Sequence, residues 1–250
     1  MNSTVRSLEA ASPDENAAGF LVGSLNPLRY DSHTYDPDEV SGIVTSMIPE
    51  RARVLDVGCG TGILAQILTE RRHADVVGIE PDPPRAKLAT SRGLTVHSGY
   101  LTPETVGSLG KFDVVLFADV IEHLPNPQAI LTTAREALAE GGAVVLSVPN
   151  VAHWSVRVDL IRGRFQYRDC GIMDATHLRW FTANSVKSLL ESVGLRPVEY
   201  RATAGLALSD NFLRRPWRWL RQRPRERLLR AASKRWPTLF GCQHVLKATL

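Results

Sequence analysis

Glycine stands at three alternate positions, Gly58, Gly60 and Gly62, directly after a short apolar run over residues 53–57. Because glycine has no side chain, the backbone can approach a ligand closely at these points, and a helix that begins next offers free N–H groups. Asp56 precedes the loop, where a carboxylate suits a cationic amine, and Glu80 ends the next apolar run, where an acid can bind ribose hydroxyls. The pattern predicts a loop that binds a cationic nucleoside, and its plain alternative is a tight strand-to-helix turn without a ligand.

Two common ligands of glycine-rich loops do not fit this loop. A dinucleotide fingerprint needs glycine three positions after Gly60, where Ile63 stands. A phosphate loop needs Gly-Lys-Ser/Thr, which the sequence lacks, and Asp56 would repel a pyrophosphate. The loop therefore favours neither a dinucleotide nor a nucleoside triphosphate.

The elements that must position these residues alternate between strand and helix. Apolar runs predict strands over 53–57, 75–79, 94–97, 112–117, 143–148, 195–201 and 243–250. Helices are predicted over 37–47, 63–70, 84–91, 127–139 and 182–193, the first capped by Asp36 and the fourth ended by Gly141 and Gly142. The strands are continuous apolar runs, which is typical of a parallel sheet covered on both faces, so the predicted fold class is α/β.

The stretch from Val54 to Gly62 resembles the first motif of the class I, Rossmann-like methyltransferases that depend on S-adenosyl-L-methionine. Phe112 to Leu124 resembles their fourth motif, and the resemblance covers about residues 35–201. It implies a doubly wound, mostly parallel seven-stranded sheet, S-adenosyl-L-methionine as cofactor and S-adenosyl-L-homocysteine as product. The predicted organisation is a partly flexible extension over 1–34 and a methyltransferase domain over 35–250, with an acceptor-site insertion over 149–181 and a basic helical insertion over 205–241, before the last strand.

The resemblance also assigns cofactor contacts along the chain. It implies that the three loop glycines hold the methionyl end, that Asp56 supports the loop or the amine, and that Glu80 takes the ribose. Asp119 would line the cleft at the end of its strand. Gly99, Tyr100 and Leu101 would lie near adenine, and Tyr100 occupies the place where the family often has an acid, so backbone groups and stacking would hold the base.

Two further stretches, Ser147 to Trp154 and Gly171 to Thr182, resemble bacterial methyltransferases related to the ubiquinone-pathway O-methyltransferases and to glycan and natural-product enzymes. A hydroxyl acceptor has a high pKa, so a general base assists its methylation, and histidine suits that task near neutral pH. The candidates are His123, His153 and His177, and we favour His177 because Asp174, three residues earlier, could orient its ring. In the plain alternative Asp174 and His177 brace a turn, and Glu122-His123 begins a helix.

The acceptor-site insertion offers aromatic and cationic side chains as well. Trp154, Trp180 and Phe181 are expected to line the acceptor pocket or, equally, to pack in the core. Five arginines make the insertion cationic, which fits an anionic or sugar-like acceptor or else a solvated face: Arg157, Arg162, Arg164, Arg168 and Arg179. No metal is predicted, because no acidic or histidine ligand cluster is visible in the sequence.

Charge is unevenly distributed along the 250 residues. Residues 201–250 carry 12 Lys/Arg against 2 Asp/Glu, whereas the remainder carries 18 against 24. Arginine, tryptophan and leucine alternate over 212–236, which predicts docking on an anionic membrane surface. Nucleic acid is the less favoured partner, and a lid or a homodimer contact is the plain alternative.

The predicted activity is therefore O-methylation of a small-molecule, sugar or lipid-linked hydroxyl. Three cysteines far apart and a polar start without a signal-peptide pattern predict a cytoplasmic enzyme, with a peripheral place at the inner membrane face if the basic segment docks there. The alternatives are N- or C-methylation on the same scaffold, a cofactor-binding protein without turnover, and an RNA methyltransferase. Against the last, Ala118-Asp119-Val120-Ile121 stands where base amino methyltransferases carry Asn-Pro-Pro-Tyr.

Overall fold

A computed structural model describes residues 35–206, 208 and 219–250 of the protein. Its centre is a seven-stranded sheet with the strand order β3-β2-β1-β4-β5-β7-β6. Only β7 runs antiparallel, to β5 and β6 on either side. The predicted mostly parallel, doubly wound sheet is thus confirmed. The strands are β1 (Arg53–Val57), β2 (Asp75–Glu80), β3 (Thr95–Ser98), β4 (Phe112–Ala118), β5 (Leu138–Pro149), β6 (Arg196–Ala202) and β7 (Gln243–Thr249).

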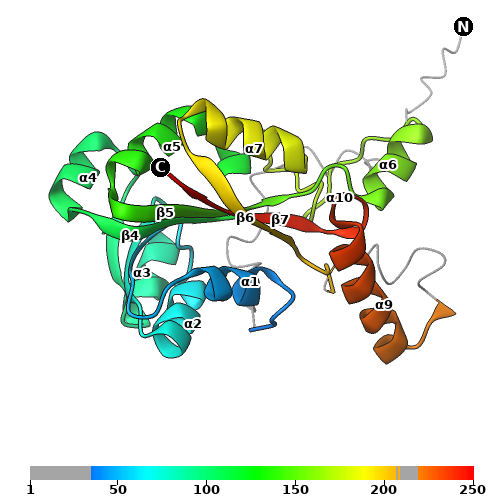
Figure 1. Ribbon diagram of the computed structural model, residues 1–250, viewed down its shortest axis with the longest axis horizontal. Coiled ribbons are helices and arrows are strands. Elements are labelled where there is room, and N and C mark those ends of the chain that lie inside the picture. Colours follow the sequence, from blue (N-terminus) through cyan, green and yellow to red (C-terminus); the bar gives the residue numbers. More distant parts are fainter. Residues whose placement is uncertain (1–34, 207, 209–218) are drawn as a thin grey trace, which may run out of the picture.

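Helices cover both faces of this sheet (Figure 1). One face carries α1 (Val40–Met47), α2 (Ile63–Arg72) and α3 (Pro83–Ser91), and the other carries α4 (Pro103–Leu109), α5 (Pro127–Glu136) and α7 (Ala183–Ser192). Neighbouring strand residues point to opposite cores: Val54 packs with the α1–α2 side and Leu55 with the α5–α7 side. Since both faces are buried, the strands are apolar throughout, which is why their sequences do not alternate.

Two predicted helix boundaries were wrong. The first helix begins at Val40 and not at residue 37, because Asp36 accepts a hydrogen bond from the Asp38 amide and holds a turn there, and Gly42 packs against that turn. The fourth ends at Glu136, since the Phe112 amide donates to the Ala137 carbonyl and Leu138 already pairs with β4. Gly141 and Gly142 therefore belong to an irregular start of β5.

The 149–181 insertion contains a helix that the sequence did not predict, whereas the described part of the basic insertion is helical, as predicted. The 149–181 region holds α6 (Trp154–Ile161), and the strand β4 is followed by a single 3₁₀ turn, η3 (Ile121–His123). The described part of the basic segment forms α9 (Gln222–Arg235) and α10 (Pro237–Phe240), which lie beside the sheet end where β7 begins (Figure 1). The predicted extension over 1–34 lies outside the described residues.

Ion pairs fasten α9 to the start of the domain. Arg230 donates to the carboxylates of both Asp36 and Asp38, and Lys234 pairs with Asp38 at 2.8 Å. The Arg230 guanidinium, above all through its hydrogen bond, holds the pKa of Asp36 below its usual range. Leu229 is fully buried on the same side of the helix. One face of α9 is therefore part of the folded domain.

Candidate active site

The glycine loop connects β1 to α2 with three residues in the left-handed region, at φ +74° for Gly58, +57° for Gly60 and +82° for Gly62. A side chain at position 58 would meet Val120 at 2.7 Å, whereas one at position 60 would meet nothing within 4 Å. The loop thus packs tightly against the segment after β4 at its first glycine and faces open space at its second. A ligand has room at Gly60.

Glu80 ends β2 beside this loop and is almost fully buried. Its Oε2 accepts from the Gly60 amide at 2.8 Å and its Oε1 accepts from the Asp82 amide at 3.0 Å. A carboxylate has about four acceptor sites, so further hydrogen bonds from a ligand are compatible with these two. The sequence placed Glu80 at the ribose position, and the fold puts it against the loop.

Asp56, the last residue but one of β1, is buried, and its Oδ2 has no hydrogen-bond partner among the described residues. Burial and, second, the neighbouring Glu80 carboxylate raise the pKa of Asp56 to about 7. A buried carboxyl of this kind is stabilised in its charged form by a nearby cation. The pair formed by Asp56 and Glu80 fits a positively charged ligand and opposes a phosphate.

The three residues expected near adenine have different surroundings. Gly99 donates from its amide to the Glu80 carbonyl at 3.1 Å, so it lies beside Glu80. Tyr100 is 69% exposed, and Leu101 is buried in the core between the sheet and α4. The backbone at Gly99 and the ring of Tyr100 are therefore available at this edge, whereas the Leu101 side chain packs in the core.

Asp119 follows β4 in the left-handed region, at φ +56°. Its Oδ1 accepts from the Ser147 hydroxyl at 2.7 Å and its Oδ2 accepts from the Gln243 amide at 2.6 Å. The carboxylate thus braces the ends of β4, β5 and β7. Ser147 and Gln243 had no sequence signal as site residues, because they are distant from Asp119 in the chain: the parallel pairing of β4 with β5 brings Ser147, and the antiparallel β7 brings Gln243.

Three potential ligand side chains meet next to Asp119. Glu122, His123 and His177 bring their ligand atoms within 4.8 Å of one another, and the two imidazoles contact edge to face with ring centroids 4.9 Å apart. The Glu122 carbonyl accepts from the amides of Leu178 and Arg179, so η3 is fastened to the 170–179 segment. The sequence showed no such cluster, because His177 lies 54 positions from His123.

The environment of this Glu122–His123–His177 cluster is strongly acidic. Glu122 is 1% exposed, and neither of its carboxyl oxygens has a hydrogen-bond partner among the described residues. Burial first, and then the carboxylates of Asp119 and Asp174, raise the pKa of Glu122 well above its usual range. The sequence treated Glu122 as part of a helix start and gave no sign of this burial.

The other predicted catalytic residues support the loops. Asp174 is fully buried, and its Oδ1 accepts from the amide and the hydroxyl of Thr176. Nδ1 of His177 lies 3.1 Å from the Ile172 carbonyl oxygen, so a backbone group helps to hold the ring. His153 is fully buried, and its Nδ1 caps α6 through the Ser155 amide. The fold brings His177 to the cluster and gives His153 a place in a helix cap.

Aromatic side chains gather in the same insertion. Trp180 contacts the rings of Phe165 and Tyr167, with centroids 5.6 and 6.0 Å away, and its buried indole N–H has no hydrogen-bond partner among the described residues. Phe165 is half exposed, whereas Phe181 is buried in the main core. Of these two predicted pocket residues, Trp180 still fits a place in an acceptor pocket, whereas Phe181 packs in the core.

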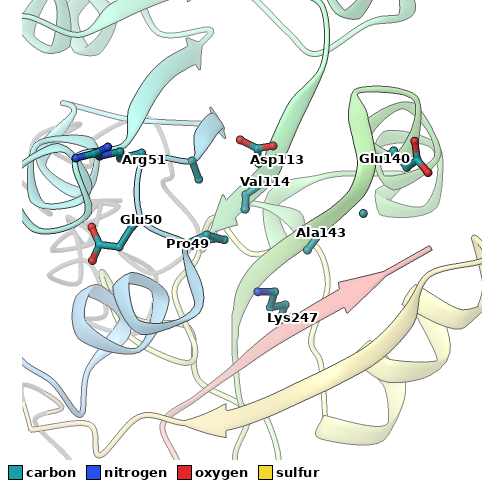
Figure 2. Close-up of a pocket in the computed structure, with 10 residues that line it drawn as sticks. Pro49, Glu50, Arg51, Asp113, Val114, Glu140, Ala143 and Lys247 are labelled. Atoms are coloured by element: carbon teal, nitrogen blue, oxygen red, sulfur yellow. The ribbon is translucent and has the colours of Figure 1, made fainter.

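A separate pocket of about 340 Å³ opens at the end of the strands opposite to the glycine loop (Figure 2). It lies at the amino ends of β1 and β4, and its charged lining mixes acids with bases: Glu50, Arg51, Asp113, Glu140 and Lys247. Open α/β sheets bind ligands at the carboxyl ends of their strands, where the glycine loop lies. We assign this pocket no part in the reaction.

Comparison with known proteins agrees with this geometry. A family model described as a methyltransferase domain matches residues 32–200. The chain is 33% identical over 184 residues to a ubiquinone biosynthesis O-methyltransferase of Cereibacter sphaeroides, covering 70% of this chain and 73% of that one. It is 31% identical over 197 residues to the enzyme of the same name from Dinoroseobacter shibae, covering 75% and 78%.

A solved structure gives the same result for the fold. The chain is similar to a SAM-dependent methyltransferase from Archaeoglobus fulgidus with a TM-score of 0.55 at 18% identity, covering 83% of this chain and 93% of that one. The room at Gly60 and the two buried carboxyls at Asp56 and Glu80 fit S-adenosyl-L-methionine, the cofactor that this family and fold imply. The chain belongs to the class I methyltransferase family and is an S-adenosylmethionine-dependent methyltransferase.

Proposed function

We propose that this methyltransferase methylates a hydroxyl oxygen of a small molecule, which includes sugar and lipid-linked acceptors. Relatives that are 31–33% identical carry the name ubiquinone biosynthesis O-methyltransferase. The observation that carries the proposal is the Glu122–His123–His177 cluster, which adjoins the cofactor loop through the contact between Val120 and Gly58. A hydroxyl needs help in losing its proton, and imidazole is suited to provide it.

The cofactor loop and its acids have the first task. Bound S-adenosyl-L-methionine supplies a methyl group on a positively charged sulfur. Gly58, Gly60 and Gly62 admit its methionyl end, Asp56 faces the positive charge, and Glu80 accepts from the ribose hydroxyls. Gly99 and Tyr100 flank the adenine. These residues fix the position of the methyl group, and alignment of donor and acceptor is the larger part of such catalysis.

The acceptor side of the site has the second task. His177 accepts the acceptor proton, and Asp174 holds the turn that presents His177. Trp180 offers a ring face and an unpartnered N–H to the acceptor. His123 lies against His177 and faces the partly exposed side of the cluster. The acceptor thus enters between the cofactor loop and the 170–180 segment.

A matched pair of acceptors tests the proposal. The protein is incubated with methyl-labelled S-adenosyl-L-methionine and either 1,2-dihydroxybenzene or 1,2-diaminobenzene, and the products are identified by mass spectrometry. Label on oxygen in the first and none on nitrogen in the second supports O-methylation. Label on nitrogen or carbon moves the activity to the alternative classes. Bound cofactor with no product from a wider hydroxyl panel, which adds sugars and lipid-linked glycans, contradicts the proposal.

We propose, in addition, that the outer side of the basic segment docks on an anionic membrane surface. The described part favours this, since Trp219, Leu228 and Trp236 are exposed beside exposed arginines. Leu229 and Arg230, which the composition also assigned to the membrane side, instead face the domain. Residues 212–218, the rest of the predicted segment, lie outside the described residues. None of the described helices is long and apolar enough to cross a membrane.

Liposome co-sedimentation tests this docking. Binding should require anionic lipid and fall as salt rises, because headgroup attraction is worth about 1 kcal/mol for each basic residue and is screened. Replacement of Trp219 and Trp236 by Ala should weaken binding at every salt concentration, since it removes apolar contact and leaves the charge. An RNA gel shift runs in parallel. RNA binding without lipid binding, or binding of neither, contradicts the membrane assignment.

A further inference from the structure

Asp119 lies between the cofactor loop and the acceptor side of the proposed site. It follows the carboxyl end of β4 with φ +56°, and the next residue, Val120, packs against Gly58 of the cofactor loop. Toward the acceptor side, the Asp119 carboxylate is close enough to affect Glu122. A left-handed backbone is unfavourable for residues other than glycine, so the surrounding contacts must hold Asp119 in this conformation.

Two side chains from other strands hold Asp119. Ser147 lies on β5 beside the end of β4, and its hydroxyl donates to Oδ1 at 2.7 Å while accepting from the Asp119 amide at 3.0 Å. The side-chain amide of Gln243, the first residue of β7, donates to Oδ2 at 2.6 Å from 124 positions further along the chain. A hydrogen bond to a carboxylate is about twice as strong as one between neutral groups, so the Gln243 contact can hold the second oxygen in place.

The position of Gln243 is fixed through its backbone and through the residues before it. Its amide donates to the Thr203 hydroxyl and its carbonyl accepts from the Thr203 amide, both at 3.1 Å, which ties β7 to the end of β6. The fully buried Asn150, just after β5, donates from Nδ2 to the carbonyls of Thr238 in α10 and of Gly241. These contacts do not involve the Gln243 side chain, so a substitution there leaves them in place.

We propose that Gln243 is a positioning residue of the cofactor site, which acts through Asp119. Its N–H orients the Asp119 carboxylate and thereby keeps Val120 against Gly58. Without this donor the Oδ2 side of the carboxylate loses a partner, and the segment from Asp119 to Val120 can shift relative to the loop. Displacements of about 1 Å can cost an enzyme about 100-fold in rate.

The same contact couples the basic segment to the cofactor site, because Gln243 follows α10 closely and Asn150 holds the end of α10 against the sheet. The arrangement of α9 and α10 is therefore transmitted to Asp119 through one side chain. This role rests on the cofactor site proposed above, and it does not depend on which acceptor is methylated.

Binding of S-adenosyl-L-homocysteine to the full chain, measured by calorimetry without an acceptor, tests the proposal. Gln243→Met keeps a long, unbranched side chain and removes the N–H, and it should weaken binding about 3- to 100-fold, the range of coupling between residues in contact. Asp119→Gly removes the carboxylate and tolerates the left-handed backbone. In that background Gln243→Met should have no further effect, because its partner is gone.

Equal losses with and without the Asp119 carboxylate overturn the proposal, as does unchanged affinity in Gln243→Met. Thermal unfolding of each variant shows whether it is folded at the temperature of the titration. Because no methyl transfer is measured, a failure of O-methylation leaves this result unchanged.

The variant Gln243→Glu supplies a second readout that a purely structural role would not change. Its new carboxyl has nearly the shape of the amide, but it can donate to Asp119 only when it carries a proton. Two carboxyls in contact share one proton at lower pH and repel each other when both are ionised. The dissociation constant of the variant, divided by that of the wild type at the same pH, should be near one at about pH 5 and rise toward about pH 8.

The titration of Asp56 and Glu122 is common to both proteins, so it cancels in this ratio. Gln128→Glu is the matched control, because Gln128 is exposed at the start of α5 and the change in charge is the same. Its ratio should stay near one at every pH. A flat ratio for Gln243→Glu, or a ratio that changes with pH for Gln128→Glu, overturns the proposal.

Discussion

The two halves of the proposed active site are built in different ways. The cofactor half comes from a nearly continuous stretch, in which Asp56 and the loop glycines adjoin and Glu80 lies one strand further. The proposed acceptor half joins η3 after β4 to residues 172–180 of the 149–181 insertion. The first half is formed mainly by the backbone of one loop, whereas the second is formed by side chains that meet only in the folded chain.

The difference also appears in how charge is arranged. In the cofactor half Glu80 accepts hydrogen bonds from the amides of Gly60 and Asp82, whereas Asp56 has an oxygen without a partner among the described residues. In the acceptor half Glu122 has two such oxygens, and Asp119 and Asp174 are near it. Both halves therefore favour positive charge, but Glu80 is fixed by backbone amides whereas Glu122 is buried without a hydrogen-bond partner among the described residues.

The largest effect is expected in the acceptor half. His177→Ala should lower kcat by about 10²–10⁴ with little change in cofactor affinity, because the proposed role of His177 is to accept the proton of the acceptor hydroxyl. Single-turnover and steady-state assays with a hydroxyl acceptor measure this. His153→Asn is the control, since Asn replaces a helix cap well and should keep most of the activity. A His177 variant with normal turnover would return the role to His153.

Glu80 gives the largest effect in the cofactor half. Glu80→Ala should weaken S-adenosyl-L-methionine by about 1.5–3 kcal/mol, because hydrogen bonds to a charged group are lost. Glu80→Gln should lose less, since its side-chain oxygen can still accept from the Gly60 amide. Calorimetry reports the affinity, and a thermal melt shows that the loop remains folded. Unchanged affinity in a folded Glu80→Ala protein would contradict the ribose assignment.

Asp56 predicts how cofactor affinity depends on pH. Its pKa is raised to about 7, so the free protein carries a proton there at lower pH. A cationic ligand favours the ionised form, so affinity should rise about tenfold between about pH 5.5 and 7, below the usual α-amino pKa of about 7.7. Stability has the opposite sign: the folded state binds the extra proton, so this contribution falls as pH rises from about 4 through about 7. Asp56→Asn should remove both slopes, and persistence of the affinity slope in that variant would assign it to another group.

The same contrast explains what the sequence could reveal. Residues of the cofactor half are close together in the sequence, so their spacing predicted that they lie together in the fold, and they do: Asp56, Gly58, Gly60, Gly62 and Glu80. The Glu122–His123–His177 cluster depends on η3 docking against the 170–179 segment through amides of Leu178 and Arg179. Backbone contacts of that kind carry no side-chain signature, so the sequence did not show that these three residues meet. The helix in the 149–181 insertion was missed for a related reason, because its packing and not its period defines it.

Gly58 and Gly60 offer the smallest effect and the sharpest test of how the halves are joined. Both have a left-handed backbone, so alanine at either position costs about 1–2 kcal/mol. Gly58→Ala should cost more, since its new methyl group meets Val120 at 2.7 Å, just before η3, whereas Gly60→Ala meets no protein atom within 4 Å. We expect Gly58→Ala to have the lower Tm, by about 2–4 °C for each additional 1 kcal/mol, and Gly60→Ala to lose cofactor affinity out of proportion to its stability.

The double variant Gly58→Ala with Val120→Ala decides whether that contact is the cause. Val120 packs on the loop at one end and leads into the Glu122–His123 turn at the other, so a displaced Val120 should move the acceptor half as well. Removing its branched side chain makes room for the new methyl group and should restore part of the Tm and of kcat lost in Gly58→Ala. If the two substitutions are simply additive, the loop and the acceptor half are not coupled through Val120, because only residues in contact show such interaction energies.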